Sequence, residues 1–421
     1  MKFKYIVFCT ATILFTLRIN FVHSNESQIP KENKIKFSHS KLMNLGMPVN
    51  SKSNEFSPTL SPDGSFMIFN SNKHGKYQDL YISYYQEGRW KNPQPMTDLN
   101  SAYNDETPYL SYDGTMLVFA SDRDGSLETP KDENGKIRVS FDIYVSFFQN
   151  NKWTLPVSIP GEVNSFLHER APTLSKDGKT LFFNRWEFGK SELTALLSSK
   201  LVNGKFTKPQ LLPKPFNMGY SDRALIEAEQ KNGFFYSSNR PDTHGGWDIF
   251  FVAFNNQEFS EPENLGRFIN TEENEIYLSR IDQRYFLCSN RKDSIGLFDI
   301  YSFYMFQKEQ KFETRAIYFD FNSEKIKLES YEYLNALVDF LNKNSELSLE
   351  IIGHTDLNGS DEFNDKLSVN RALSVKNYLT QKGISEKRLE TSGKGKREPI
   401  INKKGENFDT LNRRTEFKIL D

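Results

Sequence analysis

Short stretches of alternating hydrophobic and polar residues recur along most of the chain and are separated by polar turns. In three places two such stretches flank an Asp-Gly pair, at residues 63–64, 113–114 and 177–178. Asp-Gly between alternating segments is a strong signal for a β-hairpin. A degenerate form of the same pattern occurs at residues 231–233 and 281–283. We therefore predict one hairpin in each of five consecutive units.

The hairpins belong to a longer repeat with a period near fifty residues. Six aromatic residues each follow a short polar turn: Phe37, Trp90, Trp153, Phe206, Phe259 and Phe312. Neighbours in this series are 53 residues apart, except for one interval of 63 residues that contains a polar insertion at 129–138. A third strand is predicted to begin at Asp79, Asp142, Asp248 and Asp299. Four strands per unit at this period predict a β-propeller of about five blades over residues 35–306, with six blades as the alternative. Phe37 would supply the outer strand that closes the ring.

These units resemble the TolB-like propeller repeat, which has Ser-Pro-Asp-Gly and Asp-Ile-Tyr marks, seen here at residues 61–64 and 142–144. The repeated Asp residues are interpreted as structural, because the same position in every unit indicates a turn or a hydrogen bond between blades. No Gly-x-Ser-x-Gly, HExxH or CxxC pattern occurs, so neither a serine hydrolase nor a metal site is predicted, and no cofactor.

The last hundred residues change to an α/β pattern. Leu334, Leu337, Val338 and Leu341 recur at helical spacing, as do Ser368, Ala372, Val375 and Leu379. Strands are predicted at residues 317–321, 347–352, 389–392 and 415–420. The expected order is βαβαββ, and a hundred residues are enough for an independent domain.

One acid and one base stand out in this region. Asp356 follows the second strand in Gly-His-Thr-Asp, and Arg371 lies fifteen residues later in the next helix. An opposed carboxylate and guanidinium are suited to gripping a zwitterion. The alternative is that the two side chains form an ordinary surface salt bridge, which contributes at most about 1 kcal/mol to stability. His354 is interpreted as structural, because no Ser, Cys or second His stands nearby.

Residues 315–421 resemble the OmpA-like peptidoglycan-binding domain through many motifs in the family's order and spacing. They include residues 319–321 (FDF), 353–356 (GHTD), 367–368 (LS), 371–372 (RA), 393–395 (GKG) and 412–414 (NRR). The resemblance implies that Asp356 and Arg371 hold the diaminopimelate of a stem peptide, and that Thr355, Asn364 and Leu367 help to line the pocket. Arg413 and Arg414 match the family's Asn-Arg-Arg; the alternative is that they are solvated strand ends.

The N-terminal sequence predicts a secretory signal peptide over residues 1–24. Lys2 and Lys4 precede an apolar run at 5–17, which is shorter than the ~20 residues that span a bilayer. Cys9 lies inside this run and not after a lipobox, so lipidation is not expected. The mature chain would keep one cysteine, Cys288, predicted to be a buried inert thiol. The formal net charge of −1 does not favour nucleic-acid binding.

Together these patterns predict a signal peptide (1–24), a linker (25–34), a propeller (35–306), a second linker (307–314) and a wall-binding domain (315–421). The expected function is non-catalytic: the C-terminal domain anchors to peptidoglycan and the propeller binds an envelope protein, at the periplasmic face of the outer membrane. The alternatives are a hydrolase or lyase site carried by the propeller, and a small-ligand sensor tethered to the wall.

Overall fold

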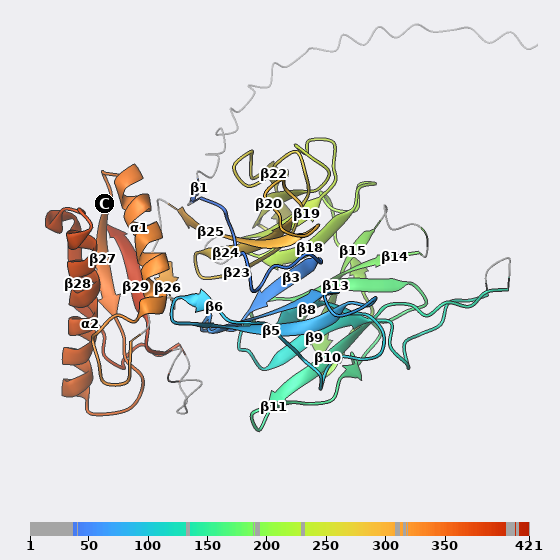
Figure 1. Cartoon of the computed structure of the whole chain (residues 1–421), viewed down its shortest axis with the longest axis horizontal. Helices are drawn as coiled ribbons and strands as arrows, with labels where there is room; N and C mark the ends of the chain where they lie inside the picture. Colours follow the sequence, from blue (N-terminus) through green and yellow to red (C-terminus); the bar gives the residue numbers. More distant parts are fainter. Residues whose placement is uncertain are drawn as a thin grey trace, which may run out of the picture. The chain divides into compact units, whose positions relative to one another are not determined.

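The computed structural model describes residues 37–39, 41–131, 135–187, 189, 194–228, 232–307, 312–314, 317, 319–400, 409 and 412–420. This part is a mostly β, multidomain chain in which curled antiparallel sheets precede an α/β domain (Figure 1). The predicted signal peptide lies outside the described residues. Within them, we find no helix with the length and apolar character needed to cross a membrane.

Five sheets share one plan, in which three long antiparallel strands follow one another along the chain. The first contains β3 (Glu55–Leu60), β4 (Phe66–Ser71), β5 (Asp79–Gln86), β6 (Arg89–Trp90) and β7 (Gln94–Pro95). The second contains β8 (Asp105–Leu110), β9 (Met116–Ser121), β10 (Asp142–Gln149), β11 (Lys152–Trp153) and β12 (Val157–Ser158). The third contains β13 (His168–Leu174), β14 (Thr180–Trp186), β15 (Ala195–Val202), β16 (Lys205–Phe206) and β17 (Gln210–Leu211).

The last two sheets follow the same plan. The fourth contains β18 (Asp222–Glu227), β19 (Gly233–Ser238), β20 (Asp248–Asn255), β21 (Glu258–Phe259) and β22 (Glu263–Asn264). The fifth contains β23 (Glu275–Ile281), β24 (Arg284–Ser289), β25 (Asp299–Gln307) and two strands from the other end of the described chain, β1 (Phe37–His39) and β2 (Met43–Asn44). β1 pairs antiparallel with β25, Phe37 opposite Gln307, where the sequence predicted an outer strand from Phe37 (Figure 1).

Each of these sheets has five strands and not the predicted four, because the outer strand is split. In the first sheet β6 and β7 both pair with β5, and Pro93 lies between them. Pro156, Pro209 and Pro262 occupy the same place in the next three sheets. Proline has no N–H to donate to a sheet ladder, so it interrupts a strand that would otherwise be continuous.

The first strands of the five sheets contact one another in a closed cycle, from β3 through β8, β13, β18 and β23 back to β3. Each has a bulge that shifts its register, with a non-glycine residue in the left-handed region at φ between 48° and 55°. These residues are Ser57, Thr107, Ala171, Ala224 and Tyr277. A bulge bends a strand locally and re-aims its side chains, so the same bend is repeated in all five sheets.

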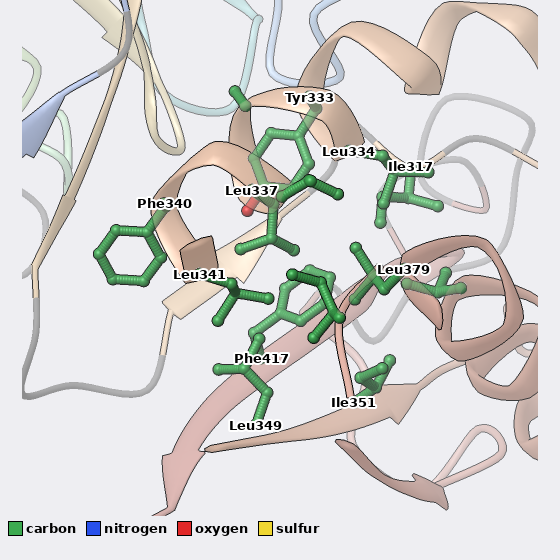
Figure 2. Close-up of a cluster of buried hydrophobic side chains, with 14 of the residues drawn as sticks. Ile317, Tyr333, Leu334, Leu337, Phe340, Leu341, Leu349, Ile351, Leu379 and Phe417 are labelled. Carbon is green, nitrogen blue, oxygen red and sulfur yellow. The ribbon is translucent and has the colours of Figure 1, made fainter. Parts of the chain in front are cut away.

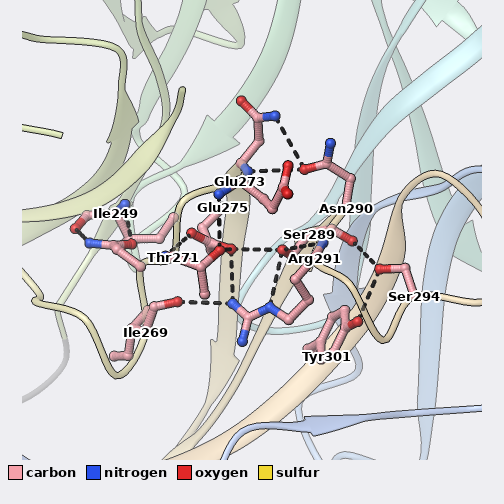
Figure 3. A network of polar contacts seen from close by, with 12 residues as sticks. Ile249, Ile269, Thr271, Glu273, Glu275, Ser289, Asn290, Arg291, Ser294 and Tyr301 are labelled. Atoms are coloured by element: carbon pink, nitrogen blue, oxygen red, sulfur yellow. Dashed lines mark hydrogen bonds and ion pairs between the residues drawn. The ribbon is translucent and has the colours of Figure 1, made fainter. Parts of the chain in front are cut away.

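A buried carboxylate fixes the start of each first strand. In the fifth sheet Glu275 accepts hydrogen bonds from the Thr271 backbone N–H (2.6 Å), the Thr271 hydroxyl (2.8 Å), the Ser289 hydroxyl (2.7 Å) and Arg291 Nη2 (2.9 Å), as Figure 3 shows. We call this arrangement the clasp. It ties the turn before β23 to the end of β24. Equivalent ion pairs join Arg123 to Asp105, Arg185 to Glu169 and Arg240 to Asp222.

Three of the four repeated aspartates at the start of the third strands accept a hydrogen bond from the loop before the strand, in agreement with the structural interpretation. Asp142 accepts the backbone N–H of Leu127 (3.0 Å), Asp248 that of His244 (2.7 Å) and Asp299 that of Ile295 (2.7 Å). Cys288 on β24 is fully buried, and burial raises the pKa of its thiol.

The C-terminal domain has the predicted βαβαββ order. Its elements are β26 (Phe312–Thr314), the short 3-10 helix η1 (Leu328–Ser330), α1 (Tyr331–Lys343), β27 (Ser348–Gly353), α2 (Asp361–Gln381), the 3-10 helix η2 (Glu386–Arg388), β28 (Leu389–Gly393) and β29 (Thr415–Leu420). The sheet order is β26-β29-β27-β28, and only the β27–β28 pair is parallel.

The first strand of this domain is not at residues 317–321, where we predicted it. Phe312–Thr314 pairs with β29 instead, so Phe312, which the repeat count included, belongs to the C-terminal sheet. In the later segment Phe319 makes only an isolated bridge to Ile326. The helix and strand predictions that follow it agree with the structure to within a turn, apart from the start of α2. The core lies between the sheet and both helices, with Leu337, Leu341, Ile351, Leu379 and Phe417 at its centre (Figure 2).

Candidate functional site

A pocket of about 170 Å³ opens beyond the C-terminal end of β27, next to the first turns of α2. Five of the predicted ligand residues line it together. The lining consists of Phe321, Asn322, Thr355, Asp356, Asn358, Gly359, Phe363, Asn364, Leu367 and Arg371.

A close approach of two elements brings the acid and the base together. A Cβ atom at Gly353 would lie 2.1 Å from the carbonyl oxygen of Ser368 on α2, so only glycine lets the end of β27 run against this helix. Ser360 then starts α2 by accepting the backbone N–H of Phe363 (3.2 Å), an N-cap hydrogen bond. As a result, the loop with Asp356 faces the helix with Arg371.

Asp356 is 5% exposed and its carboxylate is held from two sides. One oxygen accepts the backbone N–H of Asn358 (3.0 Å), and the other accepts Arg413 Nη1 (3.0 Å). The carboxylate is therefore oriented before any ligand arrives, and its negative charge is partly balanced by Arg413.

Arg371 is 1% exposed and is held by backbone carbonyl oxygens. Its Nε donates to Ser323 (3.0 Å), Nη1 to His354 (3.4 Å) and Nη2 to Asp320 (3.4 Å). Burial, together with the charge of Arg413, lowers the pKa of Arg371 to about 10. The side chain is still a cation at neutral pH, so the pocket presents a fixed positive charge.

The other predicted residues complete the wall of the pocket. Asn364 donates to the carbonyl oxygen of Asn358 (2.6 Å) and so ties the helix to the loop, while Thr355 donates to the carbonyl oxygen of Asp356 (3.1 Å). Leu367 supplies apolar surface one turn before Arg371.

The two candidate arginines just before β29 have different environments. Arg413 reaches the pocket through its ion pair with Asp356. Arg414 is turned away, because its guanidinium pairs with Glu416 (2.5 Å) and donates to the carbonyl oxygen of Glu398 (3.1 Å). Of the two arginines, only Arg413 forms an ion pair with a residue of the pocket lining.

His354 lies fully buried behind the pocket. Its ring Nε2 is 3.2 Å from the Glu416 carboxylate, and its backbone N–H donates to the Arg414 carbonyl oxygen (3.0 Å). Burial lowers the pKa of His354, although the hydrogen bond with Glu416 opposes this effect. These contacts agree with the structural interpretation of this residue.

Five lining residues were not among the predicted site residues: Phe321, Asn322, Asn358, Gly359 and Phe363. The aromatic rings are exposed, 73% for Phe321 and 46% for Phe363, which is unusual for large apolar side chains. Asn322 has φ 55°, a turn conformation that asparagine tolerates. The sequence signal for the two asparagines was their place in turns beside the motif. Among the described residues, no cluster of three His, Cys, Asp or Glu side chains is arranged to hold a metal ion.

Comparison with known proteins identifies this domain. Residues 318–413 match the model of the OmpA family. The peptidoglycan-associated lipoprotein of Buchnera aphidicola subsp. Baizongia pistaciae is 37% identical over 100 residues, which are 24% of this chain and 58% of that protein. Outer membrane protein A of Bordetella avium is 37% identical over 103 residues, 24% of this chain and 53% of that protein. The C-terminal domain is therefore an OmpA family domain.

The chain spans little more than half the length of these two relatives, whose names place them at peptidoglycan and at the outer membrane. The solved structure of the peptidoglycan-associated lipoprotein from Burkholderia pseudomallei aligns with 27% of this chain. The alignment includes 91% of the lipoprotein chain, with 25% sequence identity and a TM-score of 0.24. At that TM-score the likeness adds nothing to the assignment.

Proposed function

We propose that this protein is a non-catalytic envelope protein whose C-terminal domain, residues 315–421, grips the diaminopimelate of peptidoglycan stem peptides. The observation that carries the proposal is the convergence of Asp356 and Arg371 on one pocket within a domain of the OmpA family. The D-centre of meso-diaminopimelate carries an ammonium and a carboxylate on one carbon. Asp356 pairs with the ammonium, and Arg371 pairs with the carboxylate.

The geometry supports a grip on a zwitterion and not merely a salt bridge. Asp356 is paired with Arg413 and Arg371 is held by three carbonyl oxygens, so the two predicted ligand residues do not consume each other's charge. Thr355, Asn364 and Leu367 then shape the wall between them. In a wall built with lysine or ornithine the distal carboxylate is missing, and binding is weaker.

We further propose that the five curled sheets over residues 35–306 are the blades of a TolB-like propeller that presents a surface to an envelope protein. The closed cycle of first strands and the repeated bulge support this interpretation. The whole would tether an envelope assembly to the wall at the periplasmic face of the outer membrane. The relatives named after peptidoglycan and the outer membrane favour this location.

The test is co-sedimentation of the purified full chain with insoluble diaminopimelate-type peptidoglycan. Asp356→Asn keeps the shape of the side chain but removes its charge, and Arg371→Lys keeps the charge but loses the planar fork. A hydrogen bond to a charged group contributes about 1.5–3 kcal/mol, so each variant should bind roughly 10- to 150-fold more weakly.

Asp365→Asn is the matched control. Asp365 lies on the same helix and is paired with Arg397 at the surface, outside the pocket lining. It should sediment like the wild type. Equal binding by all four proteins, or no binding by the wild type, would overturn the proposal.

A further inference from the structure

A second pocket lies where the five curled sheets meet. Its volume is about 70 Å³, and every one of the five sheets contributes to its wall. The contributing segments are residues 59–62, 109–112, 174–176, 226–227 and 279–282, which are the ends of the first strands and the turns after them. The pocket is thus built by the same position of each repeat, while its side chains differ from sheet to sheet.

A second, smaller cavity adjoins this pocket. Tyr109, Ile226 and Ser279 line both this pocket and a much smaller cavity of about 20 Å³, which Pro58, Pro108, Pro172 and Tyr277 also line.

Groups of both charges line this pocket. Arg280 Nε donates to the carbonyl oxygen of Glu227 (3.2 Å), and one carboxylate oxygen of Glu227 accepts the backbone N–H of Lys176 (2.7 Å). Burial raises the pKa of Tyr109 to about 12, and the charges of Arg280 and Glu227 both act on it. Its phenol is therefore a neutral O–H at physiological pH and lies near a cation and an anion.

A further cation and ring stand at the wall of the pocket. The Lys176 ammonium lies 4.5 Å from the centre of the Tyr112 ring. The pocket consequently offers hydrogen-bond donors with positive charge from Arg280, an anionic acceptor from Glu227 and aromatic sides.

The size of the pocket restricts what it can hold. A water-sized group needs about 15 Å³ of such volume, so 70 Å³ accommodates roughly five of them. That is the size of an ammonium, one carbon and a carboxylate. A larger molecule fits only if the rest of it extends out of the open side.

We propose that this pocket binds the head group of an α-amino acid, with the ammonium at Glu227 and the carboxylate at Arg280 and the Tyr109 hydroxyl. The head group comes either from a free small amino acid or from the D-centre of a diaminopimelate side chain. This inference needs only the pocket between the curled sheets and does not depend on wall binding by the C-terminal domain.

The test is calorimetric titration of the purified full chain with glycine and with alanine. Both should bind, while glycinamide and N-acetylglycine, which lack one charge each, should bind at least tenfold more weakly. The Asp356→Asn variant is also titrated with a soluble tripeptide that ends in diaminopimelate. Binding of this peptide would identify the D-centre of diaminopimelate as the source of the head group, and binding of only glycine and alanine would identify free amino acids.

Glu227→Gln and Tyr109→Phe are the informative variants, because each removes one charge or one hydroxyl and keeps the shape. Each should lose at least tenfold in affinity for glycine with unchanged tryptophan fluorescence and unchanged sedimentation with peptidoglycan. Glu258→Gln, an exposed carboxylate on β21, is the control and should bind like the wild type. Absence of glycine and alanine binding at millimolar concentration, or equal binding by all variants, would overturn the inference.

Discussion

The clasp in the fifth sheet gives the sharpest prediction of stability. Glu275 is fully buried and accepts four hydrogen bonds, one of them from Arg291, whose side chain is 14% exposed. Glu275→Ala removes the anion and leaves this guanidinium buried without its carboxylate. Breaking a buried pair from one side costs about 3–5 kcal/mol, which is a large part of the stability of an ordinary domain.

Tryptophan fluorescence in urea measures this loss selectively. All four tryptophans, Trp90, Trp153, Trp186 and Trp247, lie in the curled-sheet part of the chain, so the signal reports mainly on the unfolding of that part. With the slope usual for urea unfolding, the midpoint should fall by roughly 1–2 M.

The first sheet provides a natural comparison. There Glu55 accepts hydrogen bonds from the Ser51 backbone N–H (3.0 Å) and the Ser51 and Ser71 hydroxyls, but the cation in the place of Arg291 is Lys73. Lysine can extend its ammonium to solvent when its partner is lost, so Glu55→Ala should cost only about 1–2 kcal/mol.

A double-mutant cycle decides whether the ion pair carries the effect. Glu275→Ala combined with Arg291→Met should cost clearly less than the two single changes added together, with a coupling of about 1–3 kcal/mol. If Glu275→Ala costs less than about 1 kcal/mol, or if the cycle is additive, the account of the clasp is wrong.

Two further predictions concern the same sheets. Ala171 has φ 48°, a conformation that costs an L-residue about 1–2 kcal/mol, so Ala171→Gly should raise the urea midpoint of unfolding. Ala120 lies in the extended strand β9, so Ala120→Gly should lower this midpoint. If the two variants changed the midpoint in the reverse directions, the backbone at the bulge would not be strained. His168 accepts the backbone N–H of Phe141 (3.1 Å), and burial, with the charge of Arg170, lowers its pKa to about 4. The unfolded chain then binds the proton more readily, so stability should fall by at most roughly 3 kcal/mol as the pH drops from 6.5 to 4. His168→Asn should flatten this dependence in urea titrations at several pH values, and an unchanged slope would show that other groups cause it.

The sequence predicted the elements of both regions where a local signal was strong. Asp-Gly pairs marked the turns between first and second strands, and Gly64, Gly114 and Gly178 have the positive φ that such turns require. The split of the outer strand was visible only as a proline three residues after four of the six aromatics, Trp90, Trp153, Phe206 and Phe259. Its meaning depends on which neighbour the strand pairs with, and that is information the sequence pattern does not contain.

The candidate pocket was predictable to a similar degree. The motif named the acid and the base, but not that Arg413 would pair with Asp356 while Arg414 turned to Glu416. Both arginines lie just before β29, and which partner each one reaches depends on the backbone of this segment, which the motif does not specify. The clasp was missed altogether, although a hydroxyl four residues before an acid recurs at Ser51, Ser101, Ser165 and Thr271.

The pairing of β1 with β25 has a consequence for the order in which the chain folds. Phe37 lies opposite Gln307, so this contact closes a loop of ~270 residues, at an entropic cost of roughly 5 kcal/mol. Such distant contacts form late and make folding slow. During synthesis the edge of β25 does not exist until nearly three quarters of the chain has been made. β1 is synthesised early and therefore remains unpaired until β25 has been made. During this interval the unpaired strand edges of the fifth sheet are most exposed to aggregation.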